Sequence, residues 1–204
     1  MKLSEYRESL RGERHHRPLM QGEELLARKI FAASLPYDCV RFANAYLPGA
    51  DAPVTLASMP FRRQTLYTIH WGNREVFNKG ADACGDDERA SLIHELTHVW
   101  QGHHSSFAQG YMLKSFAAQG FHGVRDVMAA RRWHGWACHR RRAYDYTSKL
   151  GQLWKSFNVE QQAAIVEDWF REWMKRGLTE AGEPTGDARY AYIEQHIRAR
   201  LGGR

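Results

Sequence analysis

The segment HELTH, from His94 to His98, constrains the fold of this chain more than any other feature. It places two histidines four residues apart, a spacing that an α-helix brings onto one face. The apolar residues around it recur with helical spacing: Leu92, Ile93, Leu96, Val99 and Trp100. At about 100° per residue, both histidines fall on the side opposite this apolar stripe. We therefore expect a helix from Asp86 to Gly102 that carries an apolar face and a separate histidine face.

The same five residues match the pattern HExxH, in which two imidazoles one turn apart bind one metal ion. Glu95 follows the first histidine and projects beside the pair, within reach of a water molecule on that metal. A zinc ion lowers the pKa of such a water to about 7. The motif predicts a Zn²⁺-dependent hydrolase with His94 and His98 as ligands and Glu95 as general base. The alternative is a pair of surface or hydrogen-bonded histidines without a metal.

A catalytic zinc needs a third protein ligand, and Glu160 is the first candidate. It lies in FNVEQQAAIVEDWF, at the start of a helix that we expect over residues 159–175, with Asn158 as its N-cap. Glu160 falls opposite the apolar stripe of that helix, as the histidines do on theirs. A carboxylate early in one helix can therefore face the two histidines of the other.

The second candidate is His104, which follows His94 by ten residues, as in the pattern HExxHxxGxxH. The glycine of that pattern makes a sharp turn, but Gln101 stands at its position here and Gly102 comes one residue late. Three further histidines stay open as ligands: His122, His134 and His139.

Hydrolysis of an amide also needs a donor for the negative charge that develops on the carbonyl oxygen. Tyr144 and Tyr146 precede Glu160 by a short distance and carry suitable hydroxyl groups. The alternative is that both tyrosines pack in the core.

The remaining sequence predicts an α+β domain, mostly helical, with a small antiparallel sheet in its N-terminal half. A helix is expected from Gly22 to Leu35, before Pro36. Four short segments rich in β-branched and aromatic residues predict strands: CVRF, PVTLA, TLYTIHW and REVF. Further helices are expected over residues 110–118, 124–132, 143–154, 159–175 and 189–201, with a turn-rich linker over 177–186. Residues 1–17 are expected to form a loosely held basic arm, and residues 18–204 a single domain.

Composition narrows the class of protein. The three cysteines, at positions 39, 84 and 138, contain no CxxC pair, so neither a disulfide framework nor a thiolate zinc site is expected. We find no signal peptide and no membrane span, and expect the chain to be cytoplasmic in the cell that makes it. The net charge of +6 is partly local, in RRWHGWACHRRR at residues 131–142. This segment suggests a rival function, a zinc-stabilised nucleic-acid-binding module, although a solvated basic surface accounts for it more simply.

The pair HELTHVWQ and FNVEQQAAIVEDWF resembles the zincin metallopeptidase-like domains of type VI secretion spike proteins and related Rhs-type effector toxins. The resemblance implies a zincin-like fold, with His94, His98 and Glu160 as zinc ligands and Glu95 as base. It also implies an antibacterial toxin that type VI secretion delivers to a target periplasm, with a secretion spike and an immunity protein as partners.

The chain also departs from the patterns of such enzymes. Thermolysin-like enzymes often place an aspartate four residues after the ligand glutamate to orient a ligand histidine, and Ala164 stands there. The partner that orients each histidine is therefore not identified from the sequence. The substrate expected is a protein or peptide, with a zinc amidase that cuts peptidoglycan peptides as the alternative.

Overall fold

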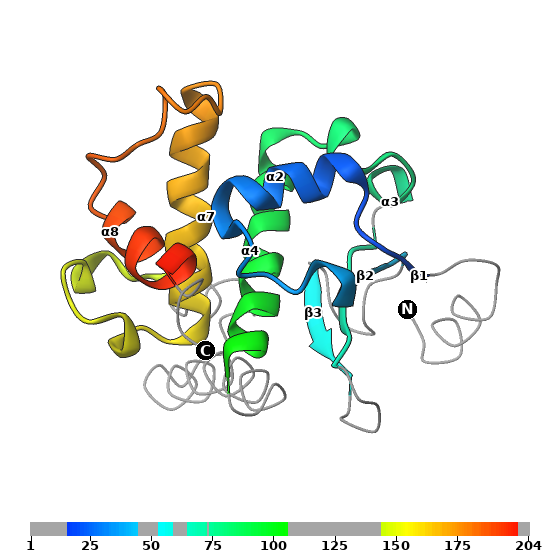
Figure 1. Cartoon of the computed structure of the whole chain (residues 1–204), viewed down its shortest axis with the longest axis horizontal. Helices are drawn as coiled ribbons and strands as arrows, with labels where there is room; N and C mark the ends of the chain where they lie inside the picture. The colour runs from blue at the N-terminus through cyan, green and yellow to red at the C-terminus, as the bar shows by residue number, and fades with distance from the viewer. Residues whose placement is uncertain (1–15, 45–52, 59–64, 73, 106–143, 200–204) are drawn as a thin grey trace, which may run out of the picture.

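The computed structural model describes residues 16–44, 53–58, 65–72, 74–105 and 144–199 (Figure 1). Its centre is a pair of long helices, α4 (Asp86–His104) and α7 (Val159–Lys175), which pack side by side. A small sheet lies against the other side of α4. The described part of the chain is thus a mixed α and β structure in which α4 lies between the sheet and α7.

The sheet has four short strands in the order β1-β2-β4-β3. They are β1 (His16–Arg17), β2 (Val40–Ala43), β3 (Val54–Ala57) and β4 (Tyr67–His70). The pairs β1–β2 and β3–β4 are antiparallel, but the central pair β2–β4 is parallel. The sheet is thus mostly antiparallel, and the expectation of an antiparallel sheet is corrected only at its central, parallel pair. The short runs indicated that strands exist, whereas their direction depends on β3 adding to the outer edge of β4, which no local pattern encodes.

The first helix, α2 (Gln21–Phe31), confirms the helix expected from Gly22, but it ends four residues before Leu35. Ala32 adopts a positive φ of 47°, which stops the helix there. At its start the buried carboxylate of Glu23 accepts the Met20 N–H at 2.8 Å and pairs with Arg17 at 2.6 Å. Arg17 belongs to the segment expected as a loose arm, and its strand and ion pair hold the end of that segment on the domain.

Two segments differ from expectation. The run REVF lies in helix α3 (Arg74–Lys79) and not in a strand, because a run this short carries no distinguishing period. The helix expected over residues 143–154 is replaced, where the structure describes it, by the 3₁₀ turns η3 (Thr147–Lys149) and η4 (Trp154–Ser156). Gly151 separates them with a left-handed φ of 89°, and its N–H donates to the hydroxyl of Tyr192 at 2.9 Å.

Short elements complete the described chain. Two are 3₁₀ turns, η1 (Tyr37–Cys39) and η2 (Gly80–Ala83), and two are the C-terminal α8 (Tyr190–Tyr192) and the π-helix η5 (Ile193–Arg198). The last two confirm a helical segment after residue 189, and residues 177–186 form turns as expected. The helices expected over 110–118 and 124–132 lie outside the described residues, as do Cys138 and the basic segment 131–142. None of the described helices combines the length and apolar composition that a membrane span requires.

Helix α4 is buried on every side from Leu92 to Gly102, so both its apolar and its polar faces are covered. The apolar side chains of α2, α4, α7 and the sheet form one core. Because α7 covers the other face, the polar residues of α4 are removed from water as well. Buried polar groups are costly unless they are hydrogen-bonded or charged partners face them. The partners of these residues therefore define the candidate site.

Candidate metal centre

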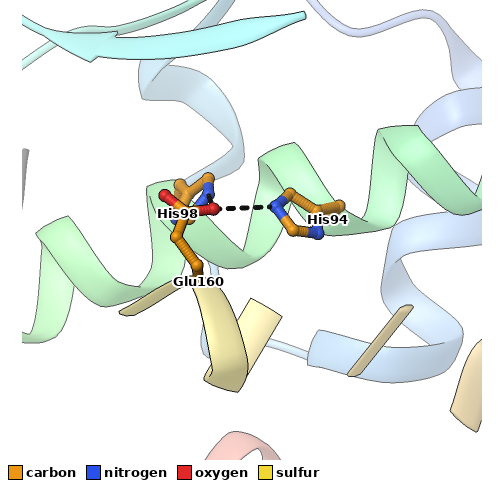
Figure 2. A group of neighbouring side chains, drawn as sticks. All are labelled: His94, His98 and Glu160. Carbon is orange, nitrogen blue, oxygen red and sulfur yellow. Dashed lines mark ion pairs between the residues drawn. The ribbon is translucent and has the colours of Figure 1, made fainter. Parts of the chain in front are cut away.

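Three buried side chains converge between α4 and α7: His94, His98 and Glu160 (Figure 2). A single carboxylate oxygen, Glu160 Oε2, lies 3.4 Å from His94 Nε2 and 3.5 Å from His98 Nε2. All three ligand atoms lie within 4.8 Å of one another. Among the described residues, this is the group of histidine, cysteine and acidic side chains that is arranged to hold a metal ion.

The separations of these atoms fit one tetrahedral ion. Ligand bonds of about 2.0–2.1 Å at tetrahedral angles place two ligand atoms about 3.3–3.4 Å apart. Glu160 Oε2 lies at nearly this distance from each of the two histidine nitrogens. Two imidazole nitrogens and one carboxylate oxygen are also a donor set that zinc accepts, with a fourth position left for water or substrate. The residues present therefore fit Zn²⁺.

Glu160 reaches the histidines because of how α7 begins. The Asn158 side chain accepts the Gln161 N–H at 2.8 Å, while the Gln161 side chain accepts the Asn158 N–H at 3.1 Å. This capping box fixes the first turn of α7 and confirms Asn158 as the predicted N-cap. Glu160 stands in that first turn, where the positive end of the helix dipole favours a carboxylate.

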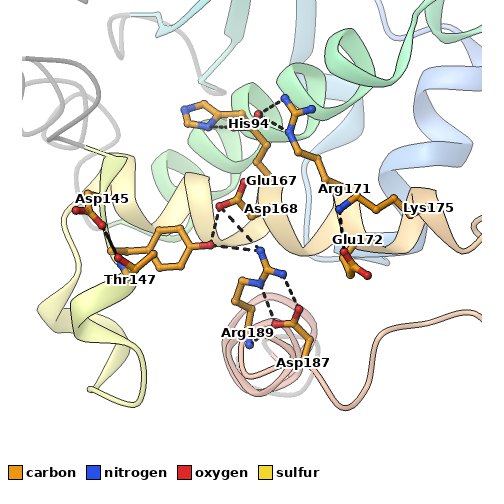
Figure 3. Close-up of polar contacts among 11 residues, drawn as sticks. His94, Asp145, Thr147, Glu167, Asp168, Arg171, Glu172, Lys175, Asp187 and Arg189 are labelled. Carbon is orange, nitrogen blue, oxygen red and sulfur yellow. Dashed lines mark hydrogen bonds and ion pairs between the residues drawn. The ribbon is translucent and has the colours of Figure 1, made fainter. Parts of the chain in front are cut away.

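His94 has an acidic partner on its outer nitrogen, Glu167, whose Oε2 lies 2.9 Å from His94 Nδ1 (Figure 3). Glu167 in turn pairs with Arg171, which also contacts Asp87 at the start of α4. The carboxylate holds a proton of His94 on Nδ1, so Nε2 is the nitrogen that faces Glu160 and that an ion would bind. Sequence reasoning missed Glu167 because it examined Ala164, one turn too early. Glu167 lies seven residues after Glu160, which is two helical turns along the same face. This helical spacing from Glu160 is the sequence feature that could have identified Glu167.

His98 has an amide partner, Gln101, whose Oε1 lies 2.8 Å from His98 Nδ1. The amide nitrogen of Gln101 donates to Val159 O at 2.9 Å and to Gln162 Oε1 at 3.0 Å. These two acceptors fix which end of the amide is nitrogen, so its oxygen must face the imidazole. An amide oxygen only accepts, so His98 Nδ1 carries a proton and Nε2 is the nitrogen directed at Glu160. In the sequence, Gln101 stood out only as the residue in place of a glycine, and its contact with His98 was not predicted.

The electrostatics of the group follow from its burial and its partners. Burial alone would raise the pKa of Glu160, but the charge of His98 and hydrogen bonds from both histidines hold that pKa well below its usual value. Burial alone would lower the pKa of His94, yet hydrogen bonds to Glu160 and Glu167 raise it to about 10. Protons on the imidazoles thus balance the buried carboxylate. A divalent cation bound by these three ligands would take over that role.

Glu95 is buried and follows His94 in α4, but it is not one of the three residues that could hold an ion. Its Oε2 accepts a hydrogen bond from Thr55 Oγ1 of β3 at 2.6 Å. Burial would lower the pKa of His98, but the charge of Glu160, with a smaller contribution from Glu95, raises it.

The structure separates the two candidate tyrosines. The ring of Tyr144 lies 5.4 Å from the ring of His94, beside the ligand group. The hydroxyl of Tyr146 donates to Asp168 at 2.6 Å and lies 3.4 Å from Arg189. Arg189 also pairs with Asp187 (Figure 3). Tyr146 is thereby held in a separate polar network, and Tyr144 is the candidate that lies at the site.

The second candidate for the third ligand, His104, lies away from the group. Its Nε2 is 2.9 Å from the carbonyl oxygen of Ser34, and it stands in the last turn of α4. The comparison of Glu160 with His104 therefore favours Glu160. The three histidines that the sequence also left open as ligands lie outside the described residues: His122, His134 and His139.

Fold and site together define a mixed α and β domain with a buried His₂Glu group between two helices. No protein-family model matches the chain. Its sequence is 25% identical over 181 residues to the type VI secretion system spike protein VgrG2b of Pseudomonas aeruginosa, a match that covers 87% of this chain and 14% of that protein. The chain therefore spans about one seventh of that relative's length.

A solved structure has a similar fold, the effector domain of Pseudomonas aeruginosa VgrG2b. It superposes with a TM-score of 0.55 at 23% sequence identity, over 87% of this chain and 83% of the other. The similarity thus covers most of this chain and most of that effector domain.

Proposed function

We propose that this chain is a zinc-dependent hydrolase, a metallopeptidase that acts as a type VI secretion effector. The observation that carries the proposal is the convergence of His94 Nε2, His98 Nε2 and Glu160 Oε2 in a buried site. The Nδ1 of each histidine faces a partner on the outer side, so Nε2 is the nitrogen directed at Glu160 that an ion would bind. Such an arrangement is more specific than the HExxH motif alone, because unrelated buried histidines have no reason to share one carboxylate oxygen and two orienting partners.

In this proposal His94, His98 and Glu160 hold the ion. When bound, a zinc ion supplies Lewis-acid activation of a water molecule and of the scissile carbonyl group. Glu95 accepts one proton of the attacking water as its oxygen bonds to the carbonyl carbon. Glu95 then returns that proton to the leaving nitrogen as the C–N bond breaks, so the products are a carboxylic acid and an amine.

Tyr144 is proposed to donate a hydrogen bond to the carbonyl oxygen as negative charge develops on it. Its place beside His94 supports this role. Tyr146 is not proposed for it, because its hydroxyl is committed to Asp168.

The effector role rests on similarity to the VgrG2b effector domain in sequence and fold. It leads us to propose that a secretion spike carries the domain to the periplasm of a target bacterium, where it is toxic, and that an immunity protein protects the producer. Directed expression tests this: export to the periplasm should arrest growth, whereas cytoplasmic expression should not. Equal toxicity in both compartments, or in neither, would contradict the proposed site of action.

The metal site is tested first, without a substrate. Purified protein is expected to contain about one zinc per chain by elemental analysis, and Glu160→Ala should lose it. His104→Ala is the matched control and should keep it, because His104 bonds to Ser34 and not to the ligand group. Full zinc content in Glu160→Ala would remove this carboxylate from the site.

The reaction is tested with Glu95→Gln, which keeps the size of the side chain but removes its basic carboxylate. Zinc content should stay at the wild-type level while hydrolysis falls about 100-fold or more. Unfolded proteins and peptidoglycan stem peptides are the two substrate classes to compare, and cleavage of the second alone would make the enzyme an amidase of the cell wall. A zinc-loaded wild type that cleaves neither would overturn the hydrolase proposal and leave a structural metal site.

A further inference from the structure

Glu95 receives a hydrogen bond from outside its own helix. The hydroxyl of Thr55 in β3 donates to Glu95 Oε2 at 2.6 Å, and both residues are buried. The same hydroxyl oxygen lies 3.2 Å from the main-chain oxygen of Glu95. One hydroxyl group therefore touches both the backbone and the carboxylate of a single residue, so its position relative to α4 is fixed.

The sheet holds this hydroxyl rigidly. Thr55 lies within β3, opposite Ile69 of β4, and β3 packs against α4. A β-branched side chain in a strand has restricted rotation about χ1, so the oxygen has little freedom to leave. Glu95, in contrast, has three rotatable side-chain bonds, and without such a contact its carboxylate would sample several orientations.

We propose that Thr55 is a positioning residue, which fixes the carboxylate of Glu95 for proton transfer. The inference rests on the proposed function of Glu95. With Oε2 occupied by the Thr55 hydroxyl, the other oxygen, Oε1, takes the proton of the attacking water. The anchor survives this transfer, because Oε2 becomes the carbonyl oxygen of the acid and still accepts the same hydrogen bond. Thr55 therefore holds Glu95 in both protonation states and exchanges no proton itself.

Thr55→Val tests the proposal, since valine keeps the shape and strand preference of threonine but lacks the hydroxyl. Zinc content should stay at wild type, kcat should fall about tenfold, the scale of one hydrogen bond to a charged group, and KM should change little. Thr55→Ser restores a hydroxyl and should recover most of kcat. Thr68→Val is the matched control, because Thr68 precedes Ile69 in β4 and so lies on the opposite face of the sheet from Thr55.

A double variant separates positioning from packing. If Thr55 acts through Glu95, Thr55→Val should have no further effect on the residual activity of Glu95→Gln. The proposal would be overturned if Thr55→Val lowered kcat equally in the wild type and in Glu95→Gln. It would also be overturned if Thr55→Ser were as slow as Thr55→Val.

A readout without activity keeps this inference distinct from the proposed hydrolysis. Crystal structures of zinc-loaded wild type and Thr55→Val should show the Glu95 carboxylate in one orientation in the first and turned or in several orientations in the second. If the wild type cleaves nothing, the proposed function fails, and these structures still decide whether Thr55 positions Glu95. An unchanged carboxylate in Thr55→Val would refute the positioning role.

Discussion

Replacement of Glu167 by glutamine should weaken zinc binding, although Glu167 is not expected to contact the ion. Its Oε2 lies 2.9 Å from His94 Nδ1, and its side chain is 20% exposed. Loss of a partner that orients a ligand histidine costs about 10- to 100-fold in metal affinity. We expect the lower end, about tenfold or 1.4 kcal/mol, because glutamine can still offer an oxygen to the Nδ1–H. Glu167→Ala, which offers none, should approach the upper end.

The control for this variant is Glu172→Gln on the same helix. Glu172 pairs with Lys175 and Arg176 at the surface, so its replacement removes the same charge from α7 without touching a ligand. Competition with a chromophoric chelator measures the zinc affinity of the wild type and of the three variants at two salt concentrations. A long-range charge effect would weaken zinc binding in both Glu167→Gln and Glu172→Gln and would fade with added salt. Loss of the His94 partner would instead weaken zinc binding in Glu167→Gln and leave it unchanged in Glu172→Gln. Wild-type affinity in both Glu167 variants would refute the assignment of Glu167 as the orienting partner.

Three further predictions concern stability and reactivity. Asn158→Ala removes the N-cap of α7 and should lower the free energy of unfolding by about 1 kcal/mol, measured by urea titration; an unchanged value would contradict the capping box with Gln161. Gly151→Ala should destabilise the protein by about 1 kcal/mol through its φ of 89° alone, since no described atom beyond its chain neighbours lies within 4 Å of the added methyl group; a neutral effect on Tm would refute that strain. Burial raises the pKa of the Cys84 thiol to about 11, so alkylation of Cys84 at pH 8, followed by peptide mass spectrometry, should be slow in the folded protein and rapid in urea; equal rates would contradict its burial.

The local parts of the candidate site could be predicted from the sequence. HELTH requires only one regular helix to bring its histidines together, and Asn158 followed by Gln161 specifies where α7 begins. The position of Glu160 opposite the apolar stripe of its helix then indicated it as the third ligand. The histidine face of α4 is buried because α7 packs on it, as a facing carboxylate on the second helix requires.

The features that the sequence did not predict depend on which helices and strands pack together. Glu167 and Gln101 orient the histidines only because α4 and α7 pack at one particular register, and neither residue carries a local signal of that register. The turns around Gly151 are held by Tyr192, about forty residues later in the chain, so a helical pattern before Trp154 was misleading. In the sheet, likewise, whether a strand pairs parallel or antiparallel depends on which strand lies beside it.

Helices α4 and α7 are distant in the sequence, and this gives the candidate centre a second consequence. An ion held by His98 and Glu160 would cross-link the chain across 62 residues (160 − 98), a span that includes residues 106–143. By the loop-closure relation used for disulfides, a cross-link of that span removes conformational entropy from the unfolded chain worth about 4 kcal/mol. The same ion would thus be a reversible cross-link that stabilises the folded chain. The domain would therefore be less stable where zinc is scarce and more stable where zinc is supplied.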